Sequence, residues 1–506
     1  MSDDNLALNQ EYSQDLNQQQ AYDNSIQGDN VQNLYSDNIQ PEELSPDISS
    51  TDDAMENEQA PEIPSEEIMP VSEENNKAKY LIIAGAVGFF VIIFAIILAV
   101  ILGRGTTQKK PVTLTYWGLW DEKQIYESVF QDYIKRNPHV KIEYQKYSPA
   151  EYRQRILARS PTGAGPDIFR FHNTWLSEVK DVVSSIPQEV MTNAQFESTF
   201  FSIHSKDLKL GNSYYGIPLY VDGLVLIYNN SLLSNAGISE PPSNWDDMIN
   251  YIEKLTVKDS SGVIQTSGLA IGNAVNVDHF SDIFGLLLIQ NGGTLKGLDS
   301  QYASQALESY RSFAEPPKEY WNADMPNSIN AFAQGKVAMV IAPTWEVISL
   351  KAMNPDLEIK VAPVPIVPGS KQITIANYWA EGVSKYSKNQ LEAWKLLKFM
   401  SEKESLTKIY EAQKKTRPFG SPYSRKDLAS TLANDPYVGT IITQAENDNL
   451  VSIPLISRTF DAGLNDNIIK YIENAVNSTS QGVSYTESLS VAKKGIDQIL
   501  LQYGIE

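Results

Sequence analysis

The chain has 506 residues, a net charge of −21 at pH 7 and no cysteine. The absence of cysteine excludes disulfide bonds, thiol catalysis, zinc sites built on thiolates and the acylated cysteine that tethers many bacterial surface proteins. The charge lies mainly at one end, because 19 Asp and Glu residues and no Lys or Arg precede Lys77. Subtracting these 19 charges from −21 leaves −2 for residues 77–506, without the basic excess that nucleic-acid binding requires.

Residues 1–76 are acidic and rich in Asn, Gln and Ser, in stretches such as QDLNQQQAYDNS and PEIPSEEIMP. A segment of this composition cannot bury enough apolar surface to offset the entropy of its chain. We therefore expect residues 1–76 to form a disordered tail. An acidic docking segment for a cytosolic partner is one interpretation, but no motif supports it, and we favour a tail that only solvates the chain.

An unbroken apolar run without a charged residue extends from Tyr80 to Leu102. As a helix rising about 1.5 Å per residue, these 23 residues would reach roughly 34 Å and cross a hydrocarbon core of about 30 Å. A signal peptide has a shorter apolar core and begins near residue 1, and a buried helix of a soluble domain rarely lacks a polar residue over this length. The sequence predicts a retained transmembrane anchor at 77–104, followed by a polar linker at 105–111.

From Val112 onward, segments with strand and helix patterns alternate. The expected strands are 112–117, 140–147, 166–171 and 337–343, with a long strand pair or ribbon at 213–229. The expected helices are 122–137, 149–160, 245–255, 278–290, 301–313, 327–334, 389–401, 403–413 and 485–503. This alternation is typical of an α/β protein with parallel-rich sheets and helices on both faces. About 395 residues are too many for one core, so we expect two lobes.

Motifs for catalysis and metal binding are absent. The four histidines, at positions 139, 172, 204 and 279, are widely spaced, and no H-E-x-x-H, phosphate-binding loop, dinucleotide-binding G-x-G-x-x-G or G-x-S-x-G motif occurs. We therefore expect no metal, no cofactor and no enzymatic activity. A glycoside-active enzyme remains an alternative, because the two carboxylates of a glycosidase need not be close in sequence.

Aromatic residues recur beside small polar residues at the ends of the expected strands, where open α/β sheets place their ligand crevice. Sugars suit such a surface. Their C–H faces stack on Trp and Tyr, and their hydroxyl groups bond to Asp, Asn and Glu.

Seven segments in order resemble the extracellular solute-binding proteins of the maltose-binding type, from Val112 nearly to the end. They are VTLTYWGLWDEK, HVKIEYQKYSPAEYRQRI, GAGPDIFRFHNTW, YGIPLYVDGLVLIYNNSLL, PPSNWDDMINYIEKL, AFAQGKVAMVIAPTWEV and IANYWAEGVSKYSKNQLEAWKLLKFMS. The resemblance implies a two-lobed fold of the type II periplasmic architecture, with ligand closing the lobes around a cleft. It implies a first lobe of about 112–221 and 378–420 and a second lobe of about 222–377 and 421–506.

The resemblance also implies a set of ligand-binding residues. They are Trp117, Trp120, Asp121, His172, Asn173, Tyr220, Asp222, Phe280, Trp345, Tyr378 and Trp379. Trp345 stands where relatives stack a Trp on a sugar ring, and it is the residue on which the prediction relies most. Asp222 matches a cleft carboxylate that accepts hydroxyl groups, with a surface ion pair as the alternative.

Other members of this set have ordinary structural explanations or depart from the pattern of the family. Trp117 and Trp345 could pack in a core, and Asn173 could cap a helix. The family often has a charged residue where this chain has Asn173. It has paired glycines where this chain has NYWAEG, beginning at Asn377, and these bulkier residues would shape the pocket differently. Phe280 follows Asp278 and His279 in a segment where the match is loose.

The implied function is the capture of a small solute, with sugars or oligosaccharides first, for an ABC permease whose ATPase is another polypeptide. A ligand-sensing receptor ectodomain is an alternative, although the chain has no kinase or coiled-coil segment. By the positive-inside rule, the more basic flank of a membrane span lies in the cytoplasm. Three basic residues follow the apolar run (Arg104, Lys109 and Lys110) and two precede it (Lys77 and Lys79), so the count slightly favours residues 112–506 in the cytoplasm. This margin is small, and a protein that captures external solute has no use on the cytoplasmic face. We therefore expect the tail in the cytoplasm and residues 112–506 outside the cell.

Overall fold

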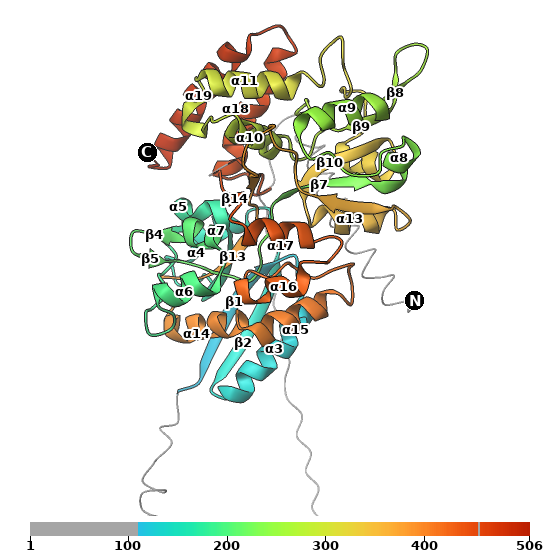
Figure 1. Ribbon diagram of the computed structural model, residues 1–506. Helices are drawn as coiled ribbons and strands as arrows, with labels where there is room; N and C mark the ends of the chain where they lie inside the picture. The colour runs from blue at the N-terminus through green and yellow to red at the C-terminus, as the bar shows by residue number, and fades with distance from the viewer. Residues whose placement is uncertain (1–109, 454–455, 506) are drawn as a thin grey trace, which may run out of the picture. The chain divides into compact units, whose positions relative to one another are not determined.

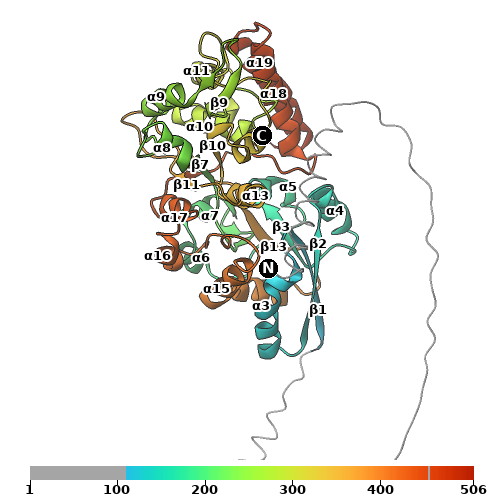
Figure 2. The same cartoon turned by 90° about the vertical axis from the view of Figure 1, so that its right-hand side faces the viewer.

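The computed structural model describes residues 110–453 and 456–505, which Figures 1 and 2 show in two views at right angles. The tail at 1–76, the anchor at 77–104 and most of the linker at 105–111 lie outside these ranges and stay predictions. Among the helices that the structure describes, none is both long and apolar enough to cross a membrane.

The first lobe is built on a five-stranded sheet with the order β2-β1-β3-β13-β6. Its strands are β1 (Val112–Leu119), β2 (Val140–Tyr147), β3 (Ile168–His172), β6 (Ile217–Pro218) and β13 (Trp379–Val383). β1 pairs in parallel with β2 and β3, whereas β13 runs antiparallel to β3 and β6. Because β13 comes from a segment that follows the whole second sheet, the first lobe is discontinuous in sequence.

Helices flank this sheet, with α3 against β2 and α14 against β13 (Figure 1). They are α3 (Lys123–Arg136), α4 (Tyr152–Arg159), the 3-10 turn η1 (Asn173–Trp175), α5 (Leu176–Val179), α6 (Asn193–Thr199), α7 (Ser202–Asp207), α14 (Gln390–Met400) and α15 (Lys403–Gln413). The expected helix at 149–160 forms only from Tyr152, because the left-handed backbone of Glu151, with φ 61°, precedes it.

The second lobe has a five-stranded sheet with the order β11-β7-β10-β9-β8. Its strands are β7 (Leu224–Asn229), β8 (Val257–Lys258), β9 (Ile264–Leu269), β10 (Val337–Pro343) and β11 (Ile359–Ala362). Only β9 and β10 pair in parallel, so the expectation of parallel-rich sheets is wrong for this lobe. The apolar run LVLIYN of β7 indicates burial on both faces, but burial carries no information about the direction of neighbouring strands.

The helices of the second lobe include a group made of α10, α11, α18 and α19, which pack on one another (Figures 1 and 2). The helices are α8 (Asn230–Asn235), α9 (Trp245–Leu255), α10 (Phe280–Gln290), η2 (Leu295–Gly297), α11 (Gln301–Arg311), α12 (Ser328–Ala333), α13 (Glu346–Met353), α18 (Leu464–Thr479) and α19 (Tyr485–Gln502). The side chain of Asn244 caps α9 as its residue type suggests, accepting a bond of 2.9 Å from the backbone N–H of Asp247.

Residues 213–229 do not form the long strand pair or ribbon that the pattern predicts. β5 (Ser213–Tyr214) pairs with β4 (Lys209–Leu210), β6 joins the first sheet and β7 joins the second. The chain therefore crosses between the lobes within this segment. Gly223 permits the crossing, because a Cβ atom there would lie 2.4 Å from the carbonyl oxygen of Ile375.

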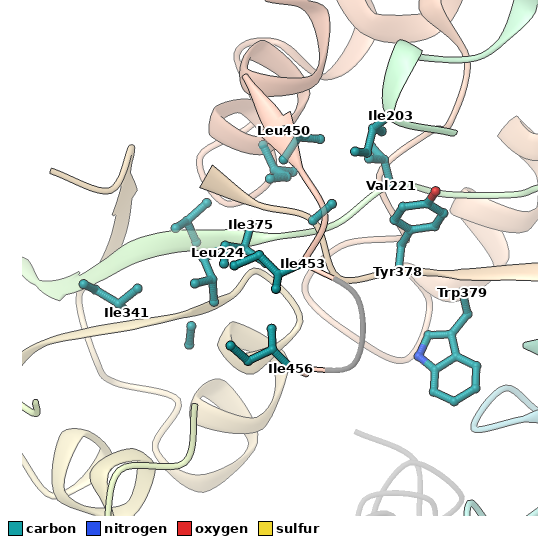
Figure 3. Packing of buried hydrophobic residues seen from close by; sticks show 14 of the residues in the cluster. Ile203, Val221, Leu224, Ile341, Ile375, Tyr378, Trp379, Leu450, Ile453 and Ile456 are labelled. Carbon is teal, nitrogen blue, oxygen red and sulfur yellow. The ribbon is translucent and has the colours of Figure 1, made fainter. Parts of the chain in front are cut away.

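The chain crosses between the lobes in three segments, the first around Gly223, the second around Ala376 and the third around Leu450. They meet beside the short parallel pair of β12 (Thr374–Ile375) and β14 (Leu450–Val451). Gly223 bridges to Ala376 in the second crossing. Apolar side chains from all three crossings are buried together, including Val221, Ile375 and Leu450 (Figure 3). The crossings are thus held by packing and by backbone hydrogen bonds.

The return from the first lobe to the second comes later than the expected residue 420. Ser424 donates to the carbonyl oxygen of Pro218 at 2.8 Å, and Lys426 donates to that of Glu197 at 2.8 Å. Residues 421–428 therefore pack on the first lobe. The turns and helices that follow are η3 (Lys426–Leu428), α16 (Ala429–Leu432) and α17 (Gly439–Glu446), of which α17 contacts β7.

Candidate functional site

Two of the predicted binding residues are exposed tryptophans, one in each lobe. Trp120 directly follows the end of β1 and is 42% exposed, and Trp345 lies just beyond the end of β10 and is 37% exposed. In open α/β sheets, ligands bind outside the carboxyl ends of the strands. These two side chains therefore have the position and the accessibility that a solute would need.

Trp120 belongs to a group of rings that we call the first-lobe aromatic group: Trp120, His172, Trp175 and Trp379. The ring of Trp379 lies edge-on to the other three, with centroid separations of 4.8 Å to Trp120, 5.1 Å to His172 and 4.9 Å to Trp175. This geometry is favourable for aromatic pairs. Trp120 has a left-handed backbone with φ 61°, which costs free energy in a bulky residue and is typical of functional loops.

Within this group, His172 is buried and hydrogen-bonded at both ring nitrogens. Nδ1 lies 2.8 Å from the hydroxyl of Thr174, and Nε2 lies 3.2 Å from Oδ1 of Asn377. Burial lowers the pKa of His172 to about 4, although the bond to Asn377 opposes this change. The imidazole is therefore neutral at pH 7 and orients the group without adding charge.

Asp121 is engaged by protein side chains rather than free. Its carboxylate accepts a bond of 2.9 Å from Tyr126 and lies 3.7 Å from Nη1 of Arg170. Arg170 also pairs with the buried Glu381 at 2.7 Å and donates to the carbonyl oxygen of Leu119 at 3.1 Å. This network holds both sides of the turn that presents Trp120.

A cavity of about 10 Å³ lies beside Arg170, Asp121 and Tyr220. This space holds about one water molecule and is too small for a sugar. Tyr220 is half-buried there, with its ring 6.0 Å from the guanidinium of Arg170.

Asn173 and Tyr378 converge on one buried carboxylate. The side-chain amide of Asn173 donates to Asp207 at 3.0 Å, and the Tyr378 hydroxyl donates to the same oxygen at 2.9 Å. Burial raises the pKa of Asp207 to about 6, against these hydrogen bonds. Figure 3 shows Tyr378 and Trp379 pointing in opposite directions, so Tyr378 faces away from the aromatic group.

Asp222 is buried and is neither a surface ion pair nor a free acceptor. One carboxylate oxygen accepts from the backbone N–H groups of Gly223 at 2.7 Å and Thr344 at 3.1 Å, and the other accepts from the Thr344 hydroxyl at 2.8 Å and the Trp345 N–H at 3.3 Å. Burial raises the pKa of Asp222 to about 6. Asp222 thus ties the first crossing to the turn that carries Trp345.

We expect Asp222→Ala to lower the free energy of unfolding by about 3 kcal/mol, because several buried donors lose their acceptor. Urea unfolding followed by circular dichroism measures this. Asp324, an exposed aspartate of the same lobe, provides the matched control, since its replacement by alanine should change stability by less than about 0.5 kcal/mol. Equal effects of the two changes would contradict the role given to Asp222.

Trp345 lies beside a charged histidine in the second lobe. The rings of Trp345 and His279 are edge-on at 5.7 Å, and His279 Nε2 lies 3.1 Å from Glu346. Burial alone would lower the pKa of His279, but hydrogen bonds to Asp282 and Glu346, with the charges of these carboxylates, raise it to about 10. His279 is therefore an imidazolium at neutral pH.

The charge of His279 predicts a pH dependence of stability. Since its folded pKa of about 10 exceeds the ordinary 6.5, its stabilising effect is complete below pH 6.5 and is lost as pH rises through 10. We expect His279→Gln to cost about 2 kcal/mol at pH 7 and clearly less near pH 11. Urea unfolding of parent and variant at both pH values measures the difference. A constant difference would contradict the assigned charge.

Phe280 and Trp117 lie in the cores of their lobes rather than at the surface. Phe280 has no exposed surface and packs under Arg458, whose guanidinium lies 5.5 Å from the ring. Trp117 is buried with its ring 4.6 Å from that of Tyr147. In this structure both side chains are enclosed by protein.

Two site residues escaped the sequence prediction. Trp175 lies three residues after His172 in FHNTW and belongs to the aromatic group, and Glu346 follows Trp345 directly and pairs with His279. The available signal was that each lies close in sequence to a predicted binding residue, His172 for Trp175 and Trp345 for Glu346. In the ranges 110–453 and 456–505, no cluster of three His, Asp or Glu side chains is arranged to hold a metal ion.

Comparisons with known proteins identify the family of this chain. The family model for the bacterial extracellular solute-binding protein matches residues 119–406. A binding protein of Brucella abortus (strain 2308) is 25% identical over 289 residues, which cover 55% of this chain and 69% of that protein. The maltodextrin-binding protein MdxE of Bacillus subtilis (strain 168) is 24% identical over 348 residues, covering 64% of this chain and 78% of that protein.

A solved structure shows the same fold. The crystal structure of a cyclo/maltodextrin-binding protein complexed with maltotetraose matches with a TM-score of 0.63 at 21% identity, covering 78% of this chain and 99% of that one. The likeness confirms the two-lobed α/β fold that the sequence predicts.

Proposed function

This chain belongs to the bacterial extracellular solute-binding proteins, and we propose that it captures a carbohydrate between its two lobes for an ABC importer. The observation that carries the proposal is the pair of exposed tryptophans, Trp120 and Trp345, one at the carboxyl end of a strand in each lobe. Aromatic faces of this kind suit the C–H faces of sugars. The names of the maltodextrin-binding relatives support the same ligand class.

Binding would proceed without chemistry. Lobes joined by three crossings can adopt more than one arrangement, and a solute that contacts both lobes favours the closed one. Trp120 and Trp345 would supply stacking. The neutral His172 packs edge-on to Trp379, which in turn packs edge-on to Trp120, and the charged His279, paired with Glu346, packs edge-on to Trp345. These contacts would fix the orientation of the two exposed tryptophans.

The proposal includes the membrane. We place the apolar run 80–102 across it as an anchor, the acidic tail in the cytoplasm and residues 112–506 outside, where a permease on another polypeptide would receive the solute. Protease treatment of intact cells tests this topology, because the C-terminal part should be digested and the tail protected. The opposite pattern would contradict it.

A titration tests the binding function. The full chain, purified in mild detergent, is mixed with maltotetraose and with a panel of other oligosaccharides while tryptophan fluorescence is recorded and the sugar is then analysed by chromatography. A saturable change with the sugar intact is expected. Shortened sugar would indicate a glycoside-active enzyme, and the lack of response to any oligosaccharide would contradict a carbohydrate ligand.

A further inference from the structure

A buried ion cluster joins the first lobe to the segment that enters α18. Arg153 of α4 donates through Nε to Asp461 at 2.6 Å and through Nη1 to Glu178 at 2.5 Å. The side chains of Arg153, Glu178 and Asp461 are 4%, 1% and 0% exposed. Because α18 packs with the helices of the second lobe, the bond from Arg153 to Asp461 connects the two lobes in addition to the three crossings.

The segment from Ile456 to Gly463 is shaped to meet this arginine. Asp461 accepts from the N–H of Gly463 at 3.1 Å, and Phe460 and Ala462 have left-handed backbones with φ 55° and 54°. A Cβ atom on Gly463 would lie 2.5 Å from Nε of Arg153, so glycine is required for the close approach. Such strained backbone persists where its surroundings determine it.

A second bond reinforces the link. The side-chain amide of Asn465, in the first turn of α18, donates to the hydroxyl of Thr174 at 2.9 Å and to the carbonyl oxygen of Ser457 at 2.8 Å. Thr174 also lies 2.8 Å from Nδ1 of His172. The start of α18 is therefore attached to the first lobe at two points, one of which touches the aromatic group.

Arg153 itself lies against that group. Its guanidinium is 6.0 Å from the ring of Trp175, which is edge-on to Trp379, and Trp379 is edge-on to the exposed Trp120. A continuous series of contacts thus runs from Asp461 through Arg153 to the surface where a solute would stack.

We propose that Arg153 is a positioning residue of the solute site, which braces the first-lobe aromatic group and couples it to the start of α18. This inference rests on the proposed function and adds to it a residue that does not touch solute. Loss of the link should free the aromatic group and the segment 456–463 together, so that a bound solute dissociates faster.

Arg153→Lys in the full chain tests the coupling, because one compact ammonium cannot occupy the places of both Nε and Nη1, from which Arg153 reaches Asp461 and Glu178. We expect oligosaccharide affinity to fall about tenfold, mainly through faster dissociation. Hydrogen exchange of the 456–463 amides in the unliganded protein should also accelerate. Arg155→Lys is the matched control, since Arg155 lies on the same helix, is exposed and pairs only with Glu151 at 3.3 Å among the described contacts; it should change neither measurement.

Gly463→Ala provides an independent variant, because its methyl group displaces the Arg153 side chain while Arg153 and every residue of the aromatic group keep their identity. It should reproduce both effects and keeps the test valid where Arg153→Lys does not fold. Faster exchange with unchanged affinity and dissociation rate would overturn the coupling, and so would weaker binding with unchanged exchange, which indicates direct solute contact. A parent protein that binds no oligosaccharide contradicts the proposed function instead, and unchanged exchange in both variants would then still overturn the link.

Discussion

Trp345→Ala is expected to weaken carbohydrate binding about thirtyfold, corresponding to a loss of about 2 kcal/mol. Trp345 is 37% exposed beyond the end of β10, and its ring lies edge-on to the His279 imidazole at 5.7 Å. Alanine removes the whole stacking surface, whereas Trp345→Phe keeps part of it and should show an intermediate affinity. Titration calorimetry with the oligosaccharide that the parent binds measures the change.

Tyr302→Ala is the control for this loss. Tyr302 lies on α11 and is an exposed aromatic residue of the same lobe, with no place in the proposed site. Its replacement should leave affinity unchanged. If Trp345→Ala binds as tightly as the parent, Trp345 does not contact the solute and the second-lobe half of the site lies elsewhere.

Arg170→Met is expected to lower the free energy of unfolding by about 3–5 kcal/mol. The methionine would leave the carboxylate of Glu381 buried without its cation, and the carbonyl oxygen of Leu119 without a donor. Chemical denaturation of the full chain, followed by circular dichroism, measures the cost. Lys141→Met, at an exposed position on β2, should change stability by less than about 0.5 kcal/mol.

A double variant separates the buried charge from lost packing. Arg170→Met combined with Glu381→Met removes both charges and should recover much of the stability, because an apolar pair of similar volume often replaces a buried ion pair at little cost. A single variant as stable as the parent would contradict the assigned network. A double variant less stable than the single one would show that the Glu381 charge is not the source of the cost.

The sequence predicted the elements whose patterns are local. β1, β2 and β10 and helices α9, α14 and α15 formed close to their expected bounds, because alternation, caps and apolar periodicity act within one element. The ordered motifs also identified the two-lobed fold. The prediction of a long ribbon at 213–229 was wrong because its two halves join different sheets. That division depends on the contact between Gly223 and Ile375, which are distant in sequence.

The sequence indicated where a candidate site would lie, but not what each of its side chains contacts. Resemblance led to the turns after β1 and β10, and both contain an exposed tryptophan. It did not reveal that the carboxylate of Asp222 is occupied by hydrogen bonds from Thr344 and Trp345, because the residue type is the same whether an aspartate binds solute or bonds to a distant turn of its own chain. Arg153 and Asp461 are 308 residues apart in sequence, and no local pattern indicates that they pair.

Hydrogen exchange with and without bound oligosaccharide tests the central claim most directly, because it reports on both lobes in one experiment. The account predicts that solute slows exchange at the Trp120 turn and at the Trp345 turn together, with the sugar recovered unchanged. Slower exchange at one of these turns alone, or a sugar recovered in cleaved form, would contradict the capture of an intact solute between the two lobes.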